Sequence, residues 1–510
     1  MKYFLTTAID YVNGSPHIGH AYEKVLADVL IRERRMRGEA YLLIGVDQHG
    51  QKVQQSAERE GLVPAALAKR NSAVFLQLWE ALGISNDGWA ETTDPRHKKA
   101  VQRVLENLRE KGELYKAIYS GYYSVRQEQF LTDKERNESG EFGPEWGQVI
   151  LVEEENWYFR LAKHKDWLLN FLRTQPDFVT PAFRHAELTH AVERMSDDLC
   201  ISRPKQRLAW GIEFSFDPEY VTYVWFDALL NYVTFAGYLA EPGSGLPAFD
   251  DLWPCKGHII GKDILVQAHG VYWPIMLHAI GFPDEQMPRL LVHGFWNMEG
   301  AKMSKSLGNV IDPFELHAKY GRDAVRFYLM RDIATGQDAD FRPDRLVSLY
   351  NSELANDLGN LVNRSLNMVQ RYRSGVIRRP SIQDSEVAAI EEQARNVIVE
   401  YHAAFDSFLP NEALAATWRL VSQANALVDL KAPWQLAKDP AQSDLLDLVL
   451  YTLAESASLL ASLIYPVLPD ASQKILAQLN VETGPELRWG VLKDGHQLGK
   501  PVPVFPRIEG

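Results

Sequence analysis

The chain has almost no cysteine and no excess of positive charge. Its 510 residues include only Cys200 and Cys255, too few for a disulfide framework or a cysteine-built metal site. We therefore expect a reducing, cytoplasmic setting. The formal net charge of -13 argues against non-specific coating of nucleic acid, because that mode of binding relies on Lys and Arg. A specific RNA partner needs only a local basic face, so this class of partner stays open.

Long hydrophobic runs are also missing. No stretch is typical of a membrane span, and residues 3–8 are already strand-like, which leaves no room for a signal or transit peptide. We therefore expect no membrane contact. The length suits two or three domains with full cores.

The first informative motif is Pro-His-Ile-Gly-His at residues 16–20, after the strand-like segment. We expect Ser15 to cap a helix whose first residue is Pro16. His17 and His20 then lie in a first turn where free N–H groups and the helix dipole attract anions. The glycine between them lacks a side chain, so a planar base can lie against the backbone. The alternative is that the histidines only complete the start of the helix.

The second motif is Lys-Met-Ser-Lys-Ser at residues 302–306. It follows a strand-like run over 290–294 and a polar loop. A doubly cationic loop suits a pyrophosphate leaving group, because its charge acts as the transition state forms. In this order, the two motifs indicate attack of a carboxylate on the α-phosphate of ATP. The alternative is a solvated pair of surface lysines.

The rest of the pattern predicts the domain organisation. Strand and helix signals alternate over about 110 residues, and 40–46 is a continuous apolar run typical of a parallel strand buried on both faces. This predicts an α/β fold, a Rossmann-like doubly wound parallel sheet, with ligands at the carboxyl ends of its strands, near His17 and Asp47. The parallel fold is expected to resume at 221–225 and 258–260. Helical spacing dominates after about 345, and the tail over 498–506 is extended.

Four consecutive ranges follow from this pattern. They are the first half of the catalytic domain (1–111), a small inserted connective domain (112–205), the second half of the catalytic domain with the lysine loop (206–345), and an α-helical bundle with the tail (346–510).

In these features the chain resembles class I aminoacyl-tRNA synthetases, most closely the methionyl-tRNA synthetases, over essentially its whole length. Beyond the two motifs, the resemblance rests on residues 45–50 (Gly-Val-Asp-Gln-His-Gly), 224–228 (Val-Trp-Phe-Asp-Ala), 261–263 (Gly-Lys-Asp) and 431–434 (Lys-Ala-Pro-Trp). It implies a ligase that activates L-methionine with ATP to methionyl-adenylate. The methionyl group is then transferred to tRNA(Met), and pyrophosphate and AMP are released.

The resemblance also implies the residues that handle ATP, which is accompanied by Mg²⁺. The catalytic residues it implies are His17, His20, Lys302 and Lys305. The ATP-binding residues it implies are His17, Gly19, His20, Gly261, Asp263, His293 and Lys305.

The amino-acid pocket needs a carboxylate for the substrate ammonium, and Asp47 is the candidate. It also needs an apolar and aromatic wall for a thioether, because sulfur contacts rings favourably. The residues that match the family pocket are Ala8, Ile9, Tyr11, Asp47, Trp225, Ala228, Leu229, Tyr232, Ile264 and His269. Asp10 and Leu229 stand where relatives carry prolines. One additional residue between Asp263 and His269 predicts a π-bulge in that helix.

The insertion departs most from the family. Many relatives carry a zinc knuckle there, but the matching positions are Ser124, Gln127, Gly143 and Trp146, and none is a usual zinc ligand. We therefore expect no zinc. The shape of the knuckle is expected to rest on packing of the aromatic residues Tyr119, Tyr122, Tyr123, Phe130 and Trp146.

Anticodon binding is expected in the helical domain. Asn360 and Arg364 are one turn apart on one helix face, and Trp434 follows a proline. An amide, a guanidinium and an indole are what the unstacked bases of a single-stranded loop require. By resemblance these three residues read the CAU anticodon. The chain ends without the additional dimerising domain of some relatives, so we expect a monomer.

Rival functions predict features that this sequence lacks. Synthetases for isoleucine, valine and leucine carry a long editing insertion, because apolar pockets discriminate poorly by one methylene. The cysteine enzyme holds its substrate through zinc, whose ligands are missing here. A non-catalytic tRNA-binding relative would have damaged motifs. A small nucleotidyltransferase would need neither the helical domain nor the lysine loop.

Overall fold

The computed structural model describes residues 1–508 apart from 128, 132, 138, 299 and 303–310, and it does not describe the side chains of 119, 129, 130, 134, 301 and 302. The chain forms two compact units. The first contains Met1–Ser15, Leu43–Leu76 and Asn86–Val292, and the second contains Pro16–Leu42, Gln77–Ser85 and His293–Gly510. Each unit joins segments that are far apart in sequence. The four consecutive domain ranges stay a prediction.

The centre of the first unit is a seven-stranded sheet. Its strands are β1 (Tyr3–Thr7), β2 (Asp10–Tyr11), β3 (Ala40–Asp47), β4 (Gly88–Glu91), β8 (Val179–Thr180), β13 (Gly257–Gly261) and β14 (Leu290–His293). They lie in the order β2-β3-β1-β13-β14-β8, with β4 beside β3, and the pairs with described registers are parallel. The predicted parallel α/β sheet is confirmed, and Asp47 is the last residue of its strand.

Helices connect and cover these strands. They are α2 (Gln51–Glu60), α3 (Pro64–Ala81), α4 (Pro95–Glu110), α5 (Lys165–Thr174), α6 (Ala182–Glu193), α7 (Val224–Thr234), α8 (Phe249–Leu252) and α9 (Trp273–Ile280). The expectation of a parallel strand over 221–225 is wrong, because α7 begins at Val224. The predicted range ends at the second residue of α7, before the polar residues Asp227, Asn231 and Thr234 that recur at helical spacing.

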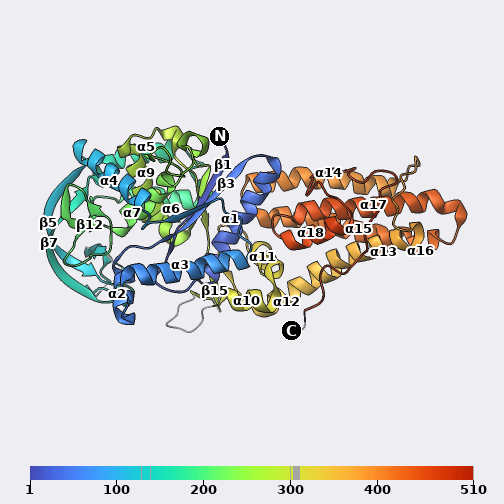
Figure 1. Ribbon diagram of the computed structural model, residues 1–510, viewed down its shortest axis with the longest axis horizontal. Helices are drawn as coiled ribbons and strands as arrows, with labels where there is room; N and C mark the ends of the chain where they lie inside the picture. Colours follow the sequence, from blue (N-terminus) through green and yellow to red (C-terminus); the bar gives the residue numbers. More distant parts are fainter. Residues whose placement is uncertain (128, 132, 138, 299, 303–310, 509–510) are drawn as a thin grey trace. The chain divides into compact units, whose positions relative to one another are not determined.

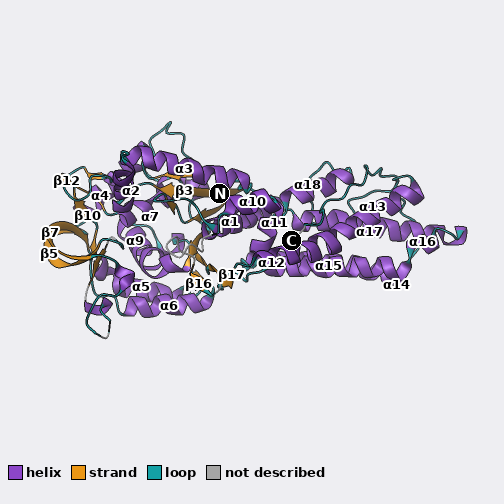
Figure 2. Ribbon diagram, turned by 90° about the horizontal axis from the view of Figure 1, so that it is seen from below, coloured by secondary structure: helices purple, strands orange, loops and turns teal. Residues whose placement is uncertain are grey.

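The insertion forms a sheet of its own within the first unit. It contains β5 (Leu114–Ser124), β6 (Gln129–Leu131), β7 (Val149–Phe159) and β9 (Leu199–Cys200), in the order β6-β5-β7-β9. The long antiparallel pair of β5 and β7 is drawn in orange and labelled at the left of Figure 2. A neighbouring three-stranded sheet contains β10 (Ser202–Pro204), β11 (Glu213–Phe214) and β12 (Asp217–Thr222).

The second unit is mainly helical. Its helices are α1 (Ile18–Arg37), α10 (Pro313–Tyr320), α11 (Arg322–Arg331), α12 (Pro343–Leu349), α13 (Asn360–Arg373), α14 (Ser385–Asp406), α15 (Pro410–Lys431), α16 (Pro433–Leu436), α17 (Ser443–Ile464) and α18 (Pro469–Gln478). A small sheet contains β15 (Trp296–Met298), β16 (Ala301–Lys302) and β17 (Ala339–Asp340). Helices α14, α15 and α17 pack side by side, as Figure 1 shows, and the predicted helical bundle is confirmed.

One helical segment corrects the expectation that no run reaches membrane length. Pro440–Ile464 has 25 residues with a mean hydropathy of 1.4 in its most apolar window, so by length and composition it passes as a span. However, 94% of that window is buried inside the protein. Its side chains pack in the helical bundle, which is the usual place of such a helix in a globular core.

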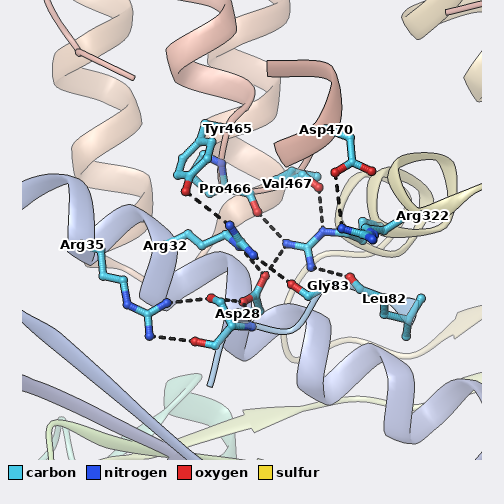
Figure 3. Close-up of polar contacts among 12 residues, drawn as sticks. Asp28, Arg32, Arg35, Leu82, Gly83, Arg322, Tyr465, Pro466, Val467 and Asp470 are labelled. Atoms are coloured by element: carbon cyan, nitrogen blue, oxygen red, sulfur yellow. Dashed lines mark hydrogen bonds and ion pairs between the residues drawn. The ribbon is translucent and has the colours of Figure 1, made fainter. Parts of the chain in front are cut away.

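A buried ion pair holds α1 within the second unit (Figure 3). The Asp28 carboxylate accepts from Arg326 Nη2 at 2.6 Å and from Arg32 Nε at 2.7 Å. Its other oxygen accepts from the backbone N–H and hydroxyl of Ser85 at 2.7 and 2.6 Å. The Arg326 guanidinium also donates to the backbone carbonyls of Leu82, Pro466 and Val467. The pair therefore joins α1, α11 and the link between α17 and α18.

Two π-helices interrupt the regular helices. One spans Leu265–Tyr272 and the other spans Tyr350–Gly359. The first follows Asp263 and contains His269, so the predicted π-bulge is confirmed. Gly270 lies in this π-helix, and a Cβ atom there would meet the Leu188 side chain at 2.5 Å and the Leu265 carbonyl at 2.8 Å. The extra residue therefore fits only because a glycine allows the close approach.

The carboxyl-terminal tail has no regular structure, and it lies on the helices of the second unit. The buried Glu455 carboxylate of α17 accepts from the backbone N–H groups of Gly490, Val491 and Leu492 at 2.7–2.9 Å. Further on, the Phe505 ring lies edge to face with Tyr350 at 6.2 Å between centroids. The tail is thus held by hydrogen bonds and ring packing, as its extended pattern predicts.

Candidate active site

The two histidines of the first motif form a reciprocal cap at the start of α1. His17 Nδ1 accepts from the Gly19 N–H at 3.1 Å, and His20 Nδ1 accepts from the His17 N–H at 3.1 Å. The expected cap at Ser15 is wrong, because His17 is the N-cap and the helix begins at Ile18. Since each Nδ1 accepts a hydrogen bond, the neutral tautomer of each ring carries its proton at Nε2. The helix start therefore presents two imidazole donors.

Close packing fixes the geometry of this pair. The ring centroids of His17 and His20 are 3.8 Å apart, with planes inclined by 31°. A Cβ at position 19 would lie 2.9 Å from His17 Cε1, so a side chain there would displace the ring. The glycine is thus required by the histidine cap, in addition to any role toward a bound base. Helix capping and anion binding are compatible, because the Nδ1 atoms cap while the Nε2 edges carry the donors.

A third histidine of the second unit lies in a cluster of buried charges. His293 Nε2 faces Glu23 Oε2 at 3.2 Å, and its Nδ1 faces the Gly294 carbonyl at 2.8 Å. Both ring nitrogens therefore lie within hydrogen-bond distance of an oxygen atom. Lys24 Nζ contacts the other Glu23 oxygen at 2.8 Å. Burial alone would raise the pKa of Glu23, but the charges of Lys24 and His293 lower this pKa below its usual value.

Sequence reasoning missed Glu23 and Lys24. Both are buried in α1, one turn beyond His20. The available signal was a charged pair at positions that the helical spacing assigns to a partly buried face.

Four other residues predicted for ATP binding or catalysis, Gly261, Asp263, Lys302 and Lys305, are described to different extents. Gly261 ends β13 and Asp263 follows it at an exposed position, and both belong to the first unit. The side chain of Lys302 and the whole of Lys305 lie outside the described residues. The lysine loop of the predicted ATP set is therefore not described.

The predicted methionine residues of the first unit are partly linked by contacts. Tyr232 donates its hydroxyl to His269 Nε2 at 2.8 Å, since His269 Nδ1–H donates to the Ile264 carbonyl at 3.1 Å. The Trp225 ring lies edge to face with His269 at 6.3 Å. Ala228 and Leu229 share α7 with Trp225 and Tyr232 and are buried. This part of the predicted set is brought together around one histidine with a fixed tautomer.

A second group of predicted residues lies at the carboxyl ends of β2 and β3. Tyr11 pairs with Asp47 in the strand register. The Asp47 carboxylate is buried, and its Oδ1 accepts from the Thr92 hydroxyl at 3.4 Å and the His49 N–H at 3.3 Å. Gly50 has φ 104°, and a Cβ there would lie 2.4 Å from the Tyr11 hydroxyl, so the turn requires glycine. Ala8 and Ile9 lie between β1 and β2 and are half-buried.

A polar network that the sequence analysis missed supports this pocket. The ring of Tyr232 stacks on His258 with 4.1 Å between centroids. Trp273 Nε1 donates to His258 Nε2 at 2.9 Å, so His258 carries its proton at Nδ1, which lies 2.5 Å from the Thr6 hydroxyl. Burial lowers the pKa of His258 well below its usual value, which keeps this ring neutral. No local signal marks it, because its partners are distant in sequence.

Hydrogen bonds link the four positions of the knuckle. The Ser124 hydroxyl donates to the Trp146 carbonyl at 2.6 Å and accepts from the Gln127 N–H at 3.0 Å. The Trp146 N–H donates to the Gly143 carbonyl at 3.1 Å. Among the described residues, no group of three or more His, Cys, Asp or Glu side chains is placed to hold a metal ion.

The predicted aromatic packing of the knuckle is only partly described. Tyr122 packs against Phe142, and Tyr123 is buried, whereas Trp146 is half-buried. The side chains of Tyr119 and Phe130 lie outside the described residues.

The predicted anticodon residues lie in the second unit on neighbouring elements. Arg364 of α13 has its guanidinium carbon 6.0 Å from the Trp434 ring centroid, and its Nη2 contacts Asp429 at 3.2 Å. Trp434 in α16 is 39% exposed, which is unusual for an indole and leaves a face for stacking. Asn360 is exposed at the first residue of α13.

The fold and the site define the class of protein first. A parallel sheet with nucleotide-type motifs at its strand ends, followed by a helical bundle, is the architecture of the class I synthetases. A family model described as "tRNA synthetases class I (M)" matches residues 3–139 and 147–366.

Similar proteins then narrow the class. A methionine--tRNA ligase of Brucella suis is 40% identical over 519 residues, which is 99% of this chain and 98% of that protein. One of Fusobacterium nucleatum is 38% identical over 521 residues, or 100% of this chain and 80% of that protein. The solved Mycobacterium tuberculosis methionyl-tRNA synthetase in complex with methionyl-adenylate has a TM-score of 0.90 and 37% identity, and the match covers 99% of this chain and 100% of that one. The chain belongs to the methionine--tRNA ligase family.

Proposed function

We propose that this chain activates L-methionine with ATP to methionyl-adenylate and transfers the methionyl group to tRNA(Met). The observation that carries the proposal is the reciprocal cap of His17 and His20, which fixes two Nε2–H donors at the start of α1. Such donors suit an in-line displacement at phosphorus, where positioning and charge stabilisation do most of the work. The family to which the chain belongs supplies the reaction.

Each ATP-site residue has a distinct part in this proposal. His17 and His20 donate to phosphate oxygens as the α-phosphorus becomes pentavalent, and Gly19 gives the base room. His293, Gly261 and Asp263 complete the nucleotide site. Lys302 and Lys305 stabilise the charge of the departing pyrophosphate. Mg²⁺ arrives on the phosphate oxygens of ATP, as is usual for this ion.

The methionine pocket combines one charge with an aromatic wall. Asp47 accepts the substrate ammonium at the carboxyl end of β3. The wall consists of Ala8, Ile9, Tyr11, Trp225, Ala228, Leu229, Tyr232, Ile264 and His269. The Tyr232 hydroxyl and His269 Nε2 are hydrogen-bonded to each other, so both rings offer mainly carbon surface to a thioether. Because their polar atoms are already paired, Tyr232 and His269 favour methionine over substrates that carry a hydroxyl or amide.

We further propose that Asn360, Arg364 and Trp434 bind the anticodon. The exposed indole provides a stacking platform and the neighbouring guanidinium reads base edges or phosphate. The knuckle is proposed to work without zinc, because hydrogen bonds link the four positions where relatives place ligands. We also propose a cytoplasmic monomer without membrane contact.

The test is amino-acid-dependent ATP–pyrophosphate exchange with methionine, leucine, isoleucine, valine and cysteine in separate reactions. Each reaction is run with and without a zinc chelator, and Mg²⁺ is restored where the chelator is present. Exchange with methionine alone supports both the activation step and the zinc-free knuckle. Exchange with another amino acid would show that the pocket is misread. No exchange at all would favour the non-catalytic reading, and loss of exchange only with chelator would overturn the zinc-free knuckle.

A further inference from the structure

Two of the sequence motifs meet at a buried acid–base pair. His49 belongs to the motif that follows β3, and Asp227 belongs to the motif that begins α7, and they are 178 residues apart. His49 Nδ1 lies 2.9 Å from Asp227 Oδ2, with side-chain exposures of 1% and 0%. Neither residue is part of the proposed pocket, although each motif contributes one residue to it, Asp47 and Trp225.

The backbone of His49 helps to orient the Asp47 carboxylate. The His49 N–H donates to Asp47 Oδ1, and the Thr92 hydroxyl donates to the same oxygen. The Gln48 N–H in turn donates to the Thr92 oxygen at 2.9 Å. The direction of the Asp47 carboxylate therefore depends on where the short loop over residues 48–50 holds its N–H groups.

The side chain of His49 is the anchor of that loop on the α7 side. Its Nδ1 contacts Asp227, while its ring lies edge to face with Trp210 at 5.4 Å. Trp210 Nε1 donates to the Gln48 carbonyl at 2.5 Å, so it holds the same loop through the backbone. The loop is also held by the Gln48 side chain, which bonds Ser72 and Thr93, and by the Gly50 N–H, which donates to the Trp210 carbonyl at 3.2 Å. Among the hydrogen bonds printed for the described part of the loop, that of the His49 side chain reaches the helix that carries Trp225.

The pair leaves polar atoms without partners, which stability alone does not favour. Among the described residues, neither Asp227 Oδ1 nor His49 Nε2 has a hydrogen-bond partner. Buried polar atoms are nearly always satisfied, so two orphans in one pair call for a reason other than folding. The Thr222 hydroxyl approaches Asp227 Oδ2 only at 3.4 Å.

Burial also removes charge from the pair. It lowers the pKa of His49 to about 3, with the Lys98 charge acting in the same direction. It raises the pKa of Asp227 well above its usual value, although the Thr222 hydroxyl and Lys98 oppose the shift. Both shifts favour the uncharged form, in which the Asp227 O–H donates to Nδ1. A carboxylate charge at Asp227 is thereby avoided beside the loop.

We propose that His49 and Asp227 form a positioning pair for methionine recognition, which ties the loop that orients Asp47 to the helix that carries Trp225. The inference rests on the proposed role of Asp47 toward the substrate ammonium. The pair sets the distance and direction of the carboxylate relative to the side-chain pocket. The pair holds the carboxylate and the side-chain pocket in place before substrate arrives, so substrate binding does not have to order either of them.

The test uses Asp227→Leu, which removes the hydrogen bond and keeps a side chain of similar size. We expect the KM for methionine in ATP–pyrophosphate exchange to rise about tenfold while kcat stays within about threefold, because ground-state binding is what the pair improves. The KM for ATP should not change. Thr234→Val is the matched control, because it removes a buried polar group from the same helix that contacts His97 at 2.8 Å instead of the loop.

A substrate analogue separates positioning from general damage to the pocket. L-methioninol keeps the ammonium, and the 2-hydroxy analogue of methionine lacks it, so inhibition constants of both are measured on each variant. The proposal expects Asp227→Leu to weaken L-methioninol about tenfold and the hydroxy analogue much less, because only the first reaches Asp47. Equal weakening of both, or the same effect in Thr234→Val, would overturn the positioning role.

Two further variants complete the design. Asp227→Asn keeps an uncharged hydrogen-bond donor toward His49 Nδ1, so it should restore most of the lost affinity. Failure of this rescue would overturn a role for the uncharged pair. Asp47→Asn tests the assignment beneath the inference. If Asp47→Asn does not weaken binding of L-methioninol more than binding of the hydroxy analogue, the proposed ammonium site fails. If it does so and Asp227→Leu has no effect, the positioning pair alone fails.

Discussion

Two buried acid–base pairs of this chain are satisfied to very different degrees. The Asp28 carboxylate in the second unit accepts four hydrogen bonds, and Arg326 donates to Asp28 and to three backbone carbonyls. The Asp227 carboxyl in the first unit has one close partner, His49, and each leaves a polar atom unpaired among the described residues. Both pairs are fully buried, so burial alone does not decide their role.

The difference separates a structural joint from a recognition device. Buried charge is costly, and a fully hydrogen-bonded pair is the arrangement that tolerates it. The Asp28 pair therefore retains its charge and joins three elements. The Asp227 pair instead gives up its charge and keeps orphan atoms beside the proposed ammonium site. We read the first as a determinant of stability and the second as a determinant of affinity, and the following predictions can break or sharpen that contrast.

The largest expected effect is on the satisfied pair. Arg326→Met removes a buried cation and leaves the Asp28 carboxylate with too few donors, so we expect a loss of about 3–5 kcal/mol in unfolding free energy. Urea unfolding followed by circular dichroism measures it. Arg395→Met removes an exposed pair with Glu391 and should change little. A loss no larger than in that control would contradict the assignment of Arg326 as a stability determinant.

A smaller effect on stability, which depends on pH, is expected at Asp323, which like Arg326 belongs to α11. Burial raises its pKa to about 6, and one oxygen is unpaired although the Ala471 N–H reaches the other at 2.7 Å. The protonated form favours the folded state, so this contribution to stability is complete below about pH 4 and is lost as pH rises through about 6. Asp323→Asn should therefore stabilise by about 2 kcal/mol above pH 6, an estimate from the size of the shift.

The measurement for Asp323 is unfolding free energy at pH 4 and pH 8 for both proteins. The advantage of the asparagine variant should be present at pH 8 and disappear at pH 4. The same advantage at both pH values would show that the carboxyl does not titrate in this window.

The third prediction concerns the pocket. Tyr232→Phe removes the hydroxyl that donates to His269 Nε2 and leaves a buried acceptor unsatisfied, so we expect a loss of about 1–2 kcal/mol in stability. The KM for methionine should rise about threefold in the exchange assay, because the His269 ring loses its partner. Tyr238→Phe, a tyrosine of the same unit outside the pocket, is the control. An unchanged KM would exclude the Tyr232–His269 contact from recognition.

The smallest effect is expected at Thr222. Its hydroxyl donates to Asp227 Oδ2 at 3.4 Å, a long contact, and accepts from the Ile212 N–H at 3.3 Å. Thr222→Val should raise the KM for methionine by about twofold or less, in line with a weak hydrogen bond. A rise larger than that of Asp227→Leu would place the anchor of the loop at Thr222 instead of His49.

The sequence predicted the parts of the fold that have a local signal. The parallel sheet follows from the apolar run that became β3, and the π-helix follows from one extra residue before His269. The start of α7 was predicted as part of a strand because residues 221–225 are all β-branched or aromatic, and the helical spacing of polar residues begins only after them. The membrane-length segment was missed although its most apolar window has a mean hydropathy of 1.4.

Residue pairing was harder to predict than residue type. His17 and His20 were placed at the helix start with Ser15 as the expected cap, and capping by the histidines was only the alternative, because histidine lacks the usual Ser, Thr, Asp or Asn signal. His49 and Asp227 were both inside named motifs, yet their contact joins residues that are distant in sequence. Only the tertiary fold reveals which polar side chains meet and which stay unpaired.

The most direct test of the contrast measures two quantities on two variants side by side. Unfolding free energy and the KM for methionine are determined for Arg326→Met and Asp227→Leu. The account predicts a crossed result: Arg326→Met loses stability and keeps the KM within about twofold, while Asp227→Leu raises the KM about tenfold at nearly unchanged stability. Parallel losses of stability and affinity in both variants would contradict it.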